Sequence, residues 1–307
     1  MNTGTDYDIF GDIHGHADNL ERLLRKLGYT RRFGVYSHPQ KRKAVFVGDF
    51  IDRGPKIRET LHLVRDMVDS GNAFSVMGNH EFNAISFHTP HTEKGGFFRD
   101  HNIKEITQHI ETLDQFKHYD SDWADFLGWF MSLPLFLELD LFRVVHACWD
   151  DRHIEFFQQH YQGINTEFLG KANNKDDGSG FYRAVNDTLK GTETVLPEGF
   201  SFVDQDGTER HECRIRWWSV PEARLTLKNV IIECPNELAN LELSDPENYL
   251  SYTNPKPVFF GHYWRKGLPR IENPSAICLD YSVAKGGLLV ACRLNEENGK
   301  MKMTLVS

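Results

Sequence analysis

The sequence predicts an α/β fold in which short parallel strands alternate with amphipathic helices. Three observations predict it: apolar runs that end at glycine or another small residue, helical periodicity at residues 17–27 and 57–68, and polar side chains directly after the runs. Ligands of open α/β folds bind at the carboxyl ends of the strands. The same pattern therefore predicts both the fold class and the location of a functional site.

The apolar run at residues 45–47 is central to this prediction. It ends at Gly48, and Asp49, Asp52 and Arg53 follow in one short loop. A buried strand, an abrupt turn and a charged loop in succession are typical of the carboxyl end of a parallel strand. We therefore expect these three charged side chains at the edge of a sheet.

Four other apolar runs, at residues 7–10, 74–77, 142–145 and 258–260, end in the same way. Five strands that end at one sheet edge would bring together the following side chains: Asp12, His14, Asp49, Asn79, His146 and His262. This set of oxygen and imidazole ligands contains no thiolate and suits hard to borderline divalent ions such as Mn, Fe, Zn or Mg. The runs therefore predict a metal centre.

We expect residues 1–307 to form a single domain that carries two insertions. Residues 82–141 are expected to be a mostly helical insertion. Residues 151–256 separate two predicted ligands, so this segment must leave the sheet and return, and we expect a cap over the site. His88 and His91 lie in a predicted loop near the site and are expected to be surface residues.

Composition and charge restrict the class of partner. The net charge of −9 argues against a nucleic-acid backbone, because phosphate binding normally demands a basic surface. The sequence has no apolar run of membrane-spanning length and no signal peptide. Its five cysteines form no C-x-x-C pair, which is typical of reduced thiols. We therefore expect a cytoplasmic protein that binds neither nucleic acid nor membrane.

The predicted metal centre suits phosphoryl transfer. Two divalent ions can clamp the attacking and leaving oxygens of a phosphoryl displacement and lower the pKa of a bound water. Asp49, after the middle strand, is the natural carboxylate to bridge both ions, and Asp12 and His14 would bind the first. The second ion would be bound by the remaining ligands: Asn79, His146 and His262.

Three further side chains are candidates for catalysis. Arg53 has a planar guanidinium suited to phosphate oxygens. His80 is next to a predicted ligand and could protonate the leaving oxygen as a general acid. Asp52 could hold that imidazole in its protonated orientation.

Five motifs carry a resemblance to a known family: Gly11-Asp12-Ile13-His14-Gly15, Gly48-Asp49-Phe50-Ile51-Asp52-Arg53-Gly54, Gly78-Asn79-His80-Glu81, His146-Ala147 and Gly261-His262. Their order and spacing resemble those of calcineurin-like metallophosphoesterases, and more narrowly the phosphoprotein phosphatase branch with its diadenosine-tetraphosphatase relatives. The resemblance implies a four-layer α/β/β/α sandwich of two facing sheets with helical cap insertions. It also implies the roles given above to the metal ligands and to Asp52, Arg53 and His80.

The resemblance further implies a second phosphate-binding arginine before the last histidine. The candidates are Arg183, Arg214, Arg216 and Arg224. We prefer Arg216, which lies beside the tryptophans at positions 217 and 218. Many members of the family have a second metal-binding histidine where this chain has Trp264, so the first metal would complete its coordination shell with water.

The leading functional expectation is metal-dependent hydrolysis of phosphomonoesters, with Mn as the expected metal and phosphoserine or phosphothreonine of proteins as candidate substrates. The alternative is symmetrical hydrolysis of dinucleoside tetraphosphates at the same centre. That branch often replaces the acid at the position of Asp52, so the presence of Asp52 favours monoesters. The net charge and the few arginines expected near the site, Arg53 and one or two from residues 183–224, also favour a single phosphate. A non-catalytic binding module is disfavoured, because His80 and every expected ligand are present.

Overall fold

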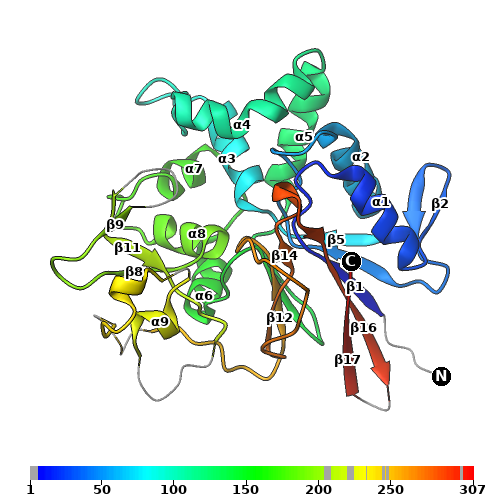
Figure 1. Ribbon diagram of the computed structural model, residues 1–307. Coiled ribbons are helices and arrows are strands. Elements are labelled where there is room, and N and C mark those ends of the chain that lie inside the picture. Colours follow the sequence, from blue (N-terminus) through cyan, green and yellow to red (C-terminus); the bar gives the residue numbers. More distant parts are fainter. Residues whose placement is uncertain are drawn as a thin grey trace.

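Two facing β-sheets form the centre of the protein, and helices lie on their outer sides (Figure 1). The structure is a computed structural model that describes residues 6–203, 209–219, 225–232, 234–243, 246, 249–297 and 300–307. The predicted α/β class, with four layers, is confirmed.

The first sheet has five strands in the order β17–β16–β1–β4–β5. Their bounds are Lys300–Val306, Ala291–Glu297, Tyr7–Phe10, Lys43–Phe46 and Ala73–Ser75. Strands β1, β4 and β5 are parallel, whereas β16 and β17 add an antiparallel edge. Three of the predicted apolar runs therefore lie side by side, with their carboxyl ends at the same edge.

The second sheet has four strands in the order β13–β12–β7–β6. Their bounds are Ala276–Cys278, Val258–Phe260, Arg143–Val145 and Phe136–Glu138. Strand β12 is parallel to β13 and β7, and β6 is antiparallel to β7. The expectation that all five runs end at one sheet edge is wrong, because two of them belong to this second sheet. The two facing sheets that the family resemblance implies are confirmed.

Four two-stranded pairs complete the β-structure among the described residues. They are β2 with β3 (Thr30–Arg32 and Val35–Ser37), β8 with β11 (Glu193–Val195 and Glu212–Arg214), β9 with β10 (Phe202–Val203 and Glu209–Arg210), and β14 with β15 (Asp280–Tyr281 and Leu288–Leu289).

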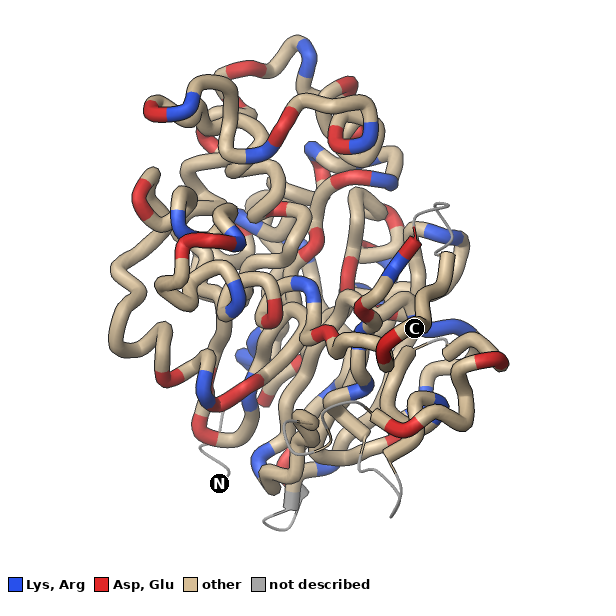
Figure 2. Tube along the Cα trace, turned by 90° about the vertical axis from the view of Figure 1, so that its left-hand side faces the viewer, with Lys and Arg blue, Asp and Glu red and all other residues tan. Residues whose placement is uncertain are grey.

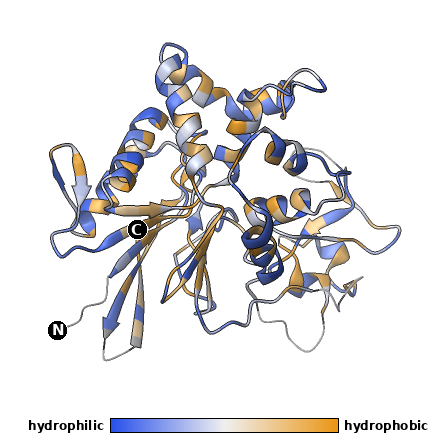
Figure 3. Cartoon of the chain, turned by 180° about the vertical axis from the view of Figure 1, so that it is seen from behind, coloured by the Kyte–Doolittle hydropathy of each residue, from blue (hydrophilic) through white to orange (hydrophobic). Residues whose placement is uncertain are grey.

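Alternate residues of each strand point to opposite faces of its sheet. Ile9 and Val45 of the first sheet belong to a buried core between the sheets, together with Val144 and Phe259 of the second. The strands are apolar along most of their length because both faces of each sheet are covered. Figure 3 shows these apolar strands in the middle of the molecule, flanked by helices of mixed hydropathy.

Helices α1 and α2 (Ala17–Lys26 and Ile57–Asp69) pack on the outer face of the first sheet, as their predicted apolar faces require. The other helices are α3 to α9, with bounds Asn79–His88, Ile103–Phe116, Asp120–Ser132, Asp151–His160, Thr166–Ala172, Phe181–Lys190 and Leu227–Val230. Within the described part of the chain, no helix combines the length and apolarity that crossing a membrane requires.

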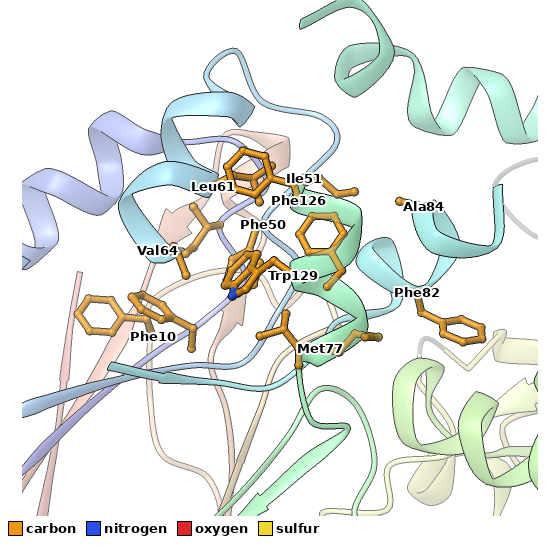
Figure 4. Packing of buried hydrophobic residues seen from close by; sticks show 14 of the residues in the cluster. Phe10, Phe50, Ile51, Leu61, Val64, Met77, Phe82, Ala84, Phe126 and Trp129 are labelled. Atoms are coloured by element: carbon orange, nitrogen blue, oxygen red, sulfur yellow. The ribbon is translucent and has the colours of Figure 1, made fainter. Parts of the chain in front are cut away.

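Helix α5 anchors the loop that follows β4. Phe126 and Trp129 of α5 pack beside Phe50 and Leu61 (Figure 4), and the rings of Phe50 and Trp129 are 5.9 Å apart between centroids. Phe50 and Ile51 are completely buried, and they lie between the two acidic residues of the loop. Apolar packing therefore fixes the segment from which those carboxylates project.

Candidate metal centre

Asp49 lies at the centre of the predicted ligands. Its Oδ2 is 3.3 Å from Nε2 of His146 and 3.6 Å from Nε2 of His14. The side chains form two groups of possible ligands. His14, Asp49 and His80 make one group, and Asp49, His146 and His262 make the other; within each group the ligand atoms all lie within 4.8 Å of one another. Because Asp49 belongs to both groups, its carboxylate is positioned to be shared by two ions.

The remaining predicted ligands border the same space. Asn79 Oδ1 is 2.9 Å from Nε2 of His146 and 2.8 Å from Nδ1 of His262. Asp12 Oδ2 accepts a hydrogen bond of 2.9 Å from the backbone N–H of His262. The structure thus brings together all six side chains predicted as ligands.

Two buried atoms of this cluster lack hydrogen-bond partners. They are Asp12 Oδ1 and His262 Nε2, as judged over the described residues. Buried polar atoms are rarely left unpaired in native proteins, because an unpaired atom costs free energy. A divalent ion would satisfy the Asp12 carboxylate oxygen, so the residues present fit the metal centre that the sequence predicts.

Backbone carbonyls orient two of the imidazoles. His14 Nδ1 lies 2.9 Å from the carbonyl oxygen of Ile51, and His146 Nδ1 lies 2.8 Å from that of Val47. A carbonyl oxygen only accepts, so each Nδ1 carries the proton and donates it. In the neutral imidazole each Nε2 is then the lone-pair atom, as metal ligation requires.

The backbone is strained where the predicted site residues lie. Nine non-glycine residues among those described have positive φ, and five of them are predicted site residues: His14, Asp49, Asp52, Arg53 and His262. Such conformations cost free energy and cluster at functional sites, where the surrounding fold enforces them.

Two motif glycines are required by close approach. A Cβ atom at Gly261 would lie 1.8 Å from Asp12 Oδ1, and one at Gly78 would lie 2.2 Å from Asp49 Oδ1. Any side chain at these positions would displace a carboxylate of the cluster. Close approach therefore explains why Asn79 and His262 are each preceded by a residue without a side chain.

His80 and Asp52 form a buried pair next to the cluster. His80 Nδ1–H donates a hydrogen bond of 2.5 Å to Asp52 Oδ2, and His80 Nε2 is 4.0 Å from Asp49 Oδ2. Burial lowers the pKa of His80, but the neighbouring carboxylates of Asp49 and Asp52 outweigh it and raise this pKa above its ordinary value. The charged imidazolium is therefore favoured, which suits a proton donor.

A cavity of about 720 Å³ opens above the cluster and is strongly cationic. Asp49, Asn79, His80 and His262 line it, together with these basic residues: Arg53, Arg99, Lys104, Lys190, Arg210, Arg214 and Lys285. Elsewhere, Figure 2 shows basic and acidic residues interspersed along the chain. The expectation of only two or three cations near the site is wrong, because α4, α8 and the β10–β11 segment contribute more.

Some cations of the cavity lie close enough to repel one another. Arg99 pairs with Glu105, and Arg214 Nε is 3.6 Å from Glu193 Oε1. Burial, together with the repulsion from Arg99 and Arg214, lowers the pKa of Lys190 to about 8. A bound anion would relieve this repulsion, so the cavity is suited to a negatively charged ligand.

The structure corrects the position expected for Arg216. Its guanidinium donates to the carbonyl oxygen of Lys228, and Arg216 does not line the cavity. Arg214, the last residue of β11, does line it. Arg183 borders a neighbouring cavity instead, and Arg224 lies outside the described residues.

Sequence reasoning missed several residues that support the site. Glu81 accepts hydrogen bonds from the backbone N–H groups of Asp49, Phe50 and Gly78, at 2.9, 2.8 and 3.0 Å. It therefore joins the loops after β4 and β5. Its position beside His80 in a motif could have identified Glu81 as a site residue. The basic residues of the cavity belong to no sequence motif that would have identified them.

The chain matches a known family over most of its length. A family model described as calcineurin-like phosphoesterase matches residues 7–263. The asymmetrical bis(5'-nucleosyl)-tetraphosphatase PrpE of Oceanobacillus iheyensis is 33% identical over 140 residues, which cover 46% of this chain and 54% of the relative. The protein of the same name from Geobacillus sp. is 31% identical over 174 residues, 55% of this chain and 61% of the relative.

The chain spans between half and two thirds of the length of these two curated relatives. Among solved structures, a protein serine/threonine phosphatase from Saccharomyces cerevisiae with similarity to human phosphatase PP5 is similar, with a TM-score of 0.51. The two chains are 15% identical, and the match covers 98% of this chain and 79% of that one. At this identity the similarity concerns the fold alone.

Proposed function

The chain belongs to the calcineurin-like phosphoesterase family, and from this premise we propose that it is a metal-dependent phosphoesterase whose substrate carries several phosphates, as a dinucleoside tetraphosphate does. The observation that carries the substrate class is the cationic lining of the cavity above the candidate metal centre. The names of the curated PrpE relatives support the same class.

The residues of this chain have distinct roles in the proposal. The six ligands would hold two divalent ions, which supply an activated water and neutralise phosphate charge when bound. Arg53 lines the cavity and would bind a phosphate oxygen through its planar guanidinium. His80, held at Nδ1 by Asp52, is left with Nε2 as the atom that gives a proton to the leaving oxygen.

We infer that the segment of residues 151–256 acts as a cap, while residues 1–307 form one domain. Lys190, Arg210 and Arg214 come from this segment and border the same cavity as the ligands. These three cations lie apart from Arg53 in the sequence. They would compensate phosphates beyond the one that reacts, a role that a single-phosphate substrate would leave unused.

Phosphomonoester hydrolysis remains the second candidate, because one observation favours it. Asp52 is present and hydrogen-bonded to His80, whereas the diadenosine-tetraphosphatase branch often replaces this acid. A general acid such as His80, held in place by Asp52, matters most when the leaving group is strongly basic, as in an alkyl phosphomonoester.

We expect kcat/KM for diadenosine tetraphosphate to exceed that for phosphomonoesters, including phosphopeptides, by at least about 10²-fold, because each added charge-assisted hydrogen bond contributes roughly 1.5–3 kcal/mol. Kinetics on both substrates, with the same metal and ionic strength, measure the ratio. Analysis of the products separates symmetrical cleavage, which gives two nucleoside diphosphates, from asymmetrical cleavage. A preference for the monoester would support the second candidate instead.

Arg214 and Arg216 provide a matched pair of variants for this test. Arg214→Ala is expected to raise KM for the dinucleotide by about 10-fold or more, since it removes one charged contact. Arg216→Ala changes the same residue type just outside the cavity and should leave KM unchanged. Equal effects of the two variants would contradict the assignment of the cavity as the phosphate site.

Removal of metal provides a separate prediction. Chelation should abolish hydrolysis of p-nitrophenyl phosphate, and Mn²⁺ or another transition ion should restore it better than Ca²⁺. The physical reason is the mixed carboxylate, amide and imidazole ligand set, since Ca²⁺ prefers oxygen ligands throughout. Activity and metal content are measured after dialysis against each ion. Full activity in protein shown to be metal-free would contradict the proposed centre.

A further inference from the structure

We propose that His109 and Thr112 of α4 are positioning residues for His80, on which they act through the carboxylate of Asp52. This inference rests on the proposed function, because it requires His80 to be the general acid. It assigns a role to two buried polar residues of the helical insertion that neither the sequence motifs nor the candidate metal centre explains.

The two oxygens of Asp52 have separate partners. His109 Nδ1–H donates to Oδ1 at 2.8 Å, and the Thr112 hydroxyl donates to the same Oδ1 at 2.6 Å. The backbone N–H of Asp52 in turn donates to Thr112 Oγ1 at 3.1 Å. Oδ2 is left to His80, whose Nδ1–H it accepts at 2.5 Å. The donors on Oδ1 thus fix the plane of the carboxylate and the direction of Oδ2.

A fifth side chain extends this network away from the cavity. His88 Nε2 is 3.2 Å from His109 Nε2. Because His109 donates through Nδ1 to a carboxylate, its neutral form accepts at Nε2, and His88 is then the donor. Burial, together with the neighbouring His109 and His101, lowers the pKa of His88 to about 4, in agreement with a neutral imidazole. His88 is therefore not the surface residue expected from the sequence.

His109 and Thr112 are buried. Thr112 is completely buried and His109 is 5% exposed. The ring of His109 lies against Phe87 and Trp123, with centroid distances of 5.4 and 5.8 Å. A carboxylate with three side-chain donors in such surroundings has little freedom to rotate. Proton transfer from His80 needs a fixed imidazole, so loss of an outer donor should impair chemistry rather than binding.

Variants that remove one donor test the inference with two esters of different leaving group. Thr112→Val is isosteric and removes the hydroxyl, and His109→Leu removes the imidazole donor. We expect kcat for an alkyl phosphate such as phosphoserine to fall by about 10–100-fold, as is typical for outer-shell partners. The fall for p-nitrophenyl phosphate should be smaller, while KM and metal content stay unchanged. Thr112→Ser and His109→Asn keep a donor and should recover most of the loss.

Thr60→Val is the matched control. Thr60 is also completely buried, but its hydroxyl donates to the carbonyl oxygen of Lys56. This variant loses a buried hydrogen bond that does not involve Asp52. It should therefore lower the free energy of unfolding and change kcat for the two esters by the same factor. If Thr112→Val behaves in the same way as Thr60→Val, the residue is merely structural and the inference is overturned.

A double-mutant cycle separates failure of the inference from failure of the proposed function. In a His80→Ala background, Thr112→Val should cause no further loss with the alkyl phosphate, because the acid that it positions is absent. If the two losses are instead additive, the inference alone fails. If His80→Ala lowers the rates of both esters equally, the acid role in the proposed function fails, and the inference fails with it.

Discussion

Replacement of Asp49 by asparagine is expected to lower turnover by about 10³-fold or more and to reduce the amount of bound metal. Asp49 Oδ2 lies 3.3 and 3.6 Å from imidazole nitrogens that belong to different ligand groups. The change therefore removes negative charge from both groups at once, whereas replacement of any other ligand affects one. Turnover of p-nitrophenyl phosphate and metal content per chain measure the two effects.

Asp122→Asn provides the same chemical change away from the cavity. The Asp122 carboxylate accepts hydrogen bonds from Arg58 and His62 of α2 and does not line the cavity, so this variant should keep its metal and its rate. The Asp49 amide has nearly the shape of the carboxylate, and its variant should fold because the backbone amides around it still bond Glu81. A near-normal rate with two bound metals in Asp49→Asn would contradict the bridging role.

The sequence predicts strand positions, and which polar side chains gather at the strand ends, because both depend on local patterns. Each of the five apolar runs overlaps a strand, and each is followed by a polar residue at its carboxyl end. Parallel strands direct the loops at their carboxyl ends to one edge, so Asp12 and Asp49 meet although 37 positions separate them. The division of the runs between two sheets cannot be inferred from the runs themselves, since buried strands look alike in either sheet.

The lining of the cavity could not be predicted in the same way. Arg214 and Arg216 are two positions apart, and alternation in a continuing strand would place them on the same face. The chain leaves β11 after Arg214, so only tertiary structure decides which arginine reaches the cavity. Lys190 comes from α8 and carries no motif. The support of Asp52 by α4 is equally hidden, since His109 occupies an otherwise ordinary buried helical position.

His80→Ala is expected to lower the rate of alkyl phosphate hydrolysis by about 10²–10⁴-fold, the usual contribution of a general acid. An alkyl phosphate leaves as a strongly basic alkoxide and needs the proton. p-Nitrophenyl phosphate has a weakly basic leaving group, and so does a dinucleoside tetraphosphate, so both should lose less. The measurement is kcat for the three substrates together with the metal content of the variant.

Asp52→Asn is the companion variant, because it removes the carboxylate that holds His80 at Nδ1 without removing the imidazole. It should reproduce the order of losses among the substrates at a smaller magnitude, with metal content intact. Loss of metal in His80→Ala would instead make His80 a ligand, a role that its 4.0 Å distance from Asp49 makes geometrically accessible. Equal losses on all three substrates would argue against proton donation by His80. The leaving-group dependence therefore discriminates between the two roles that the geometry allows for this one imidazole.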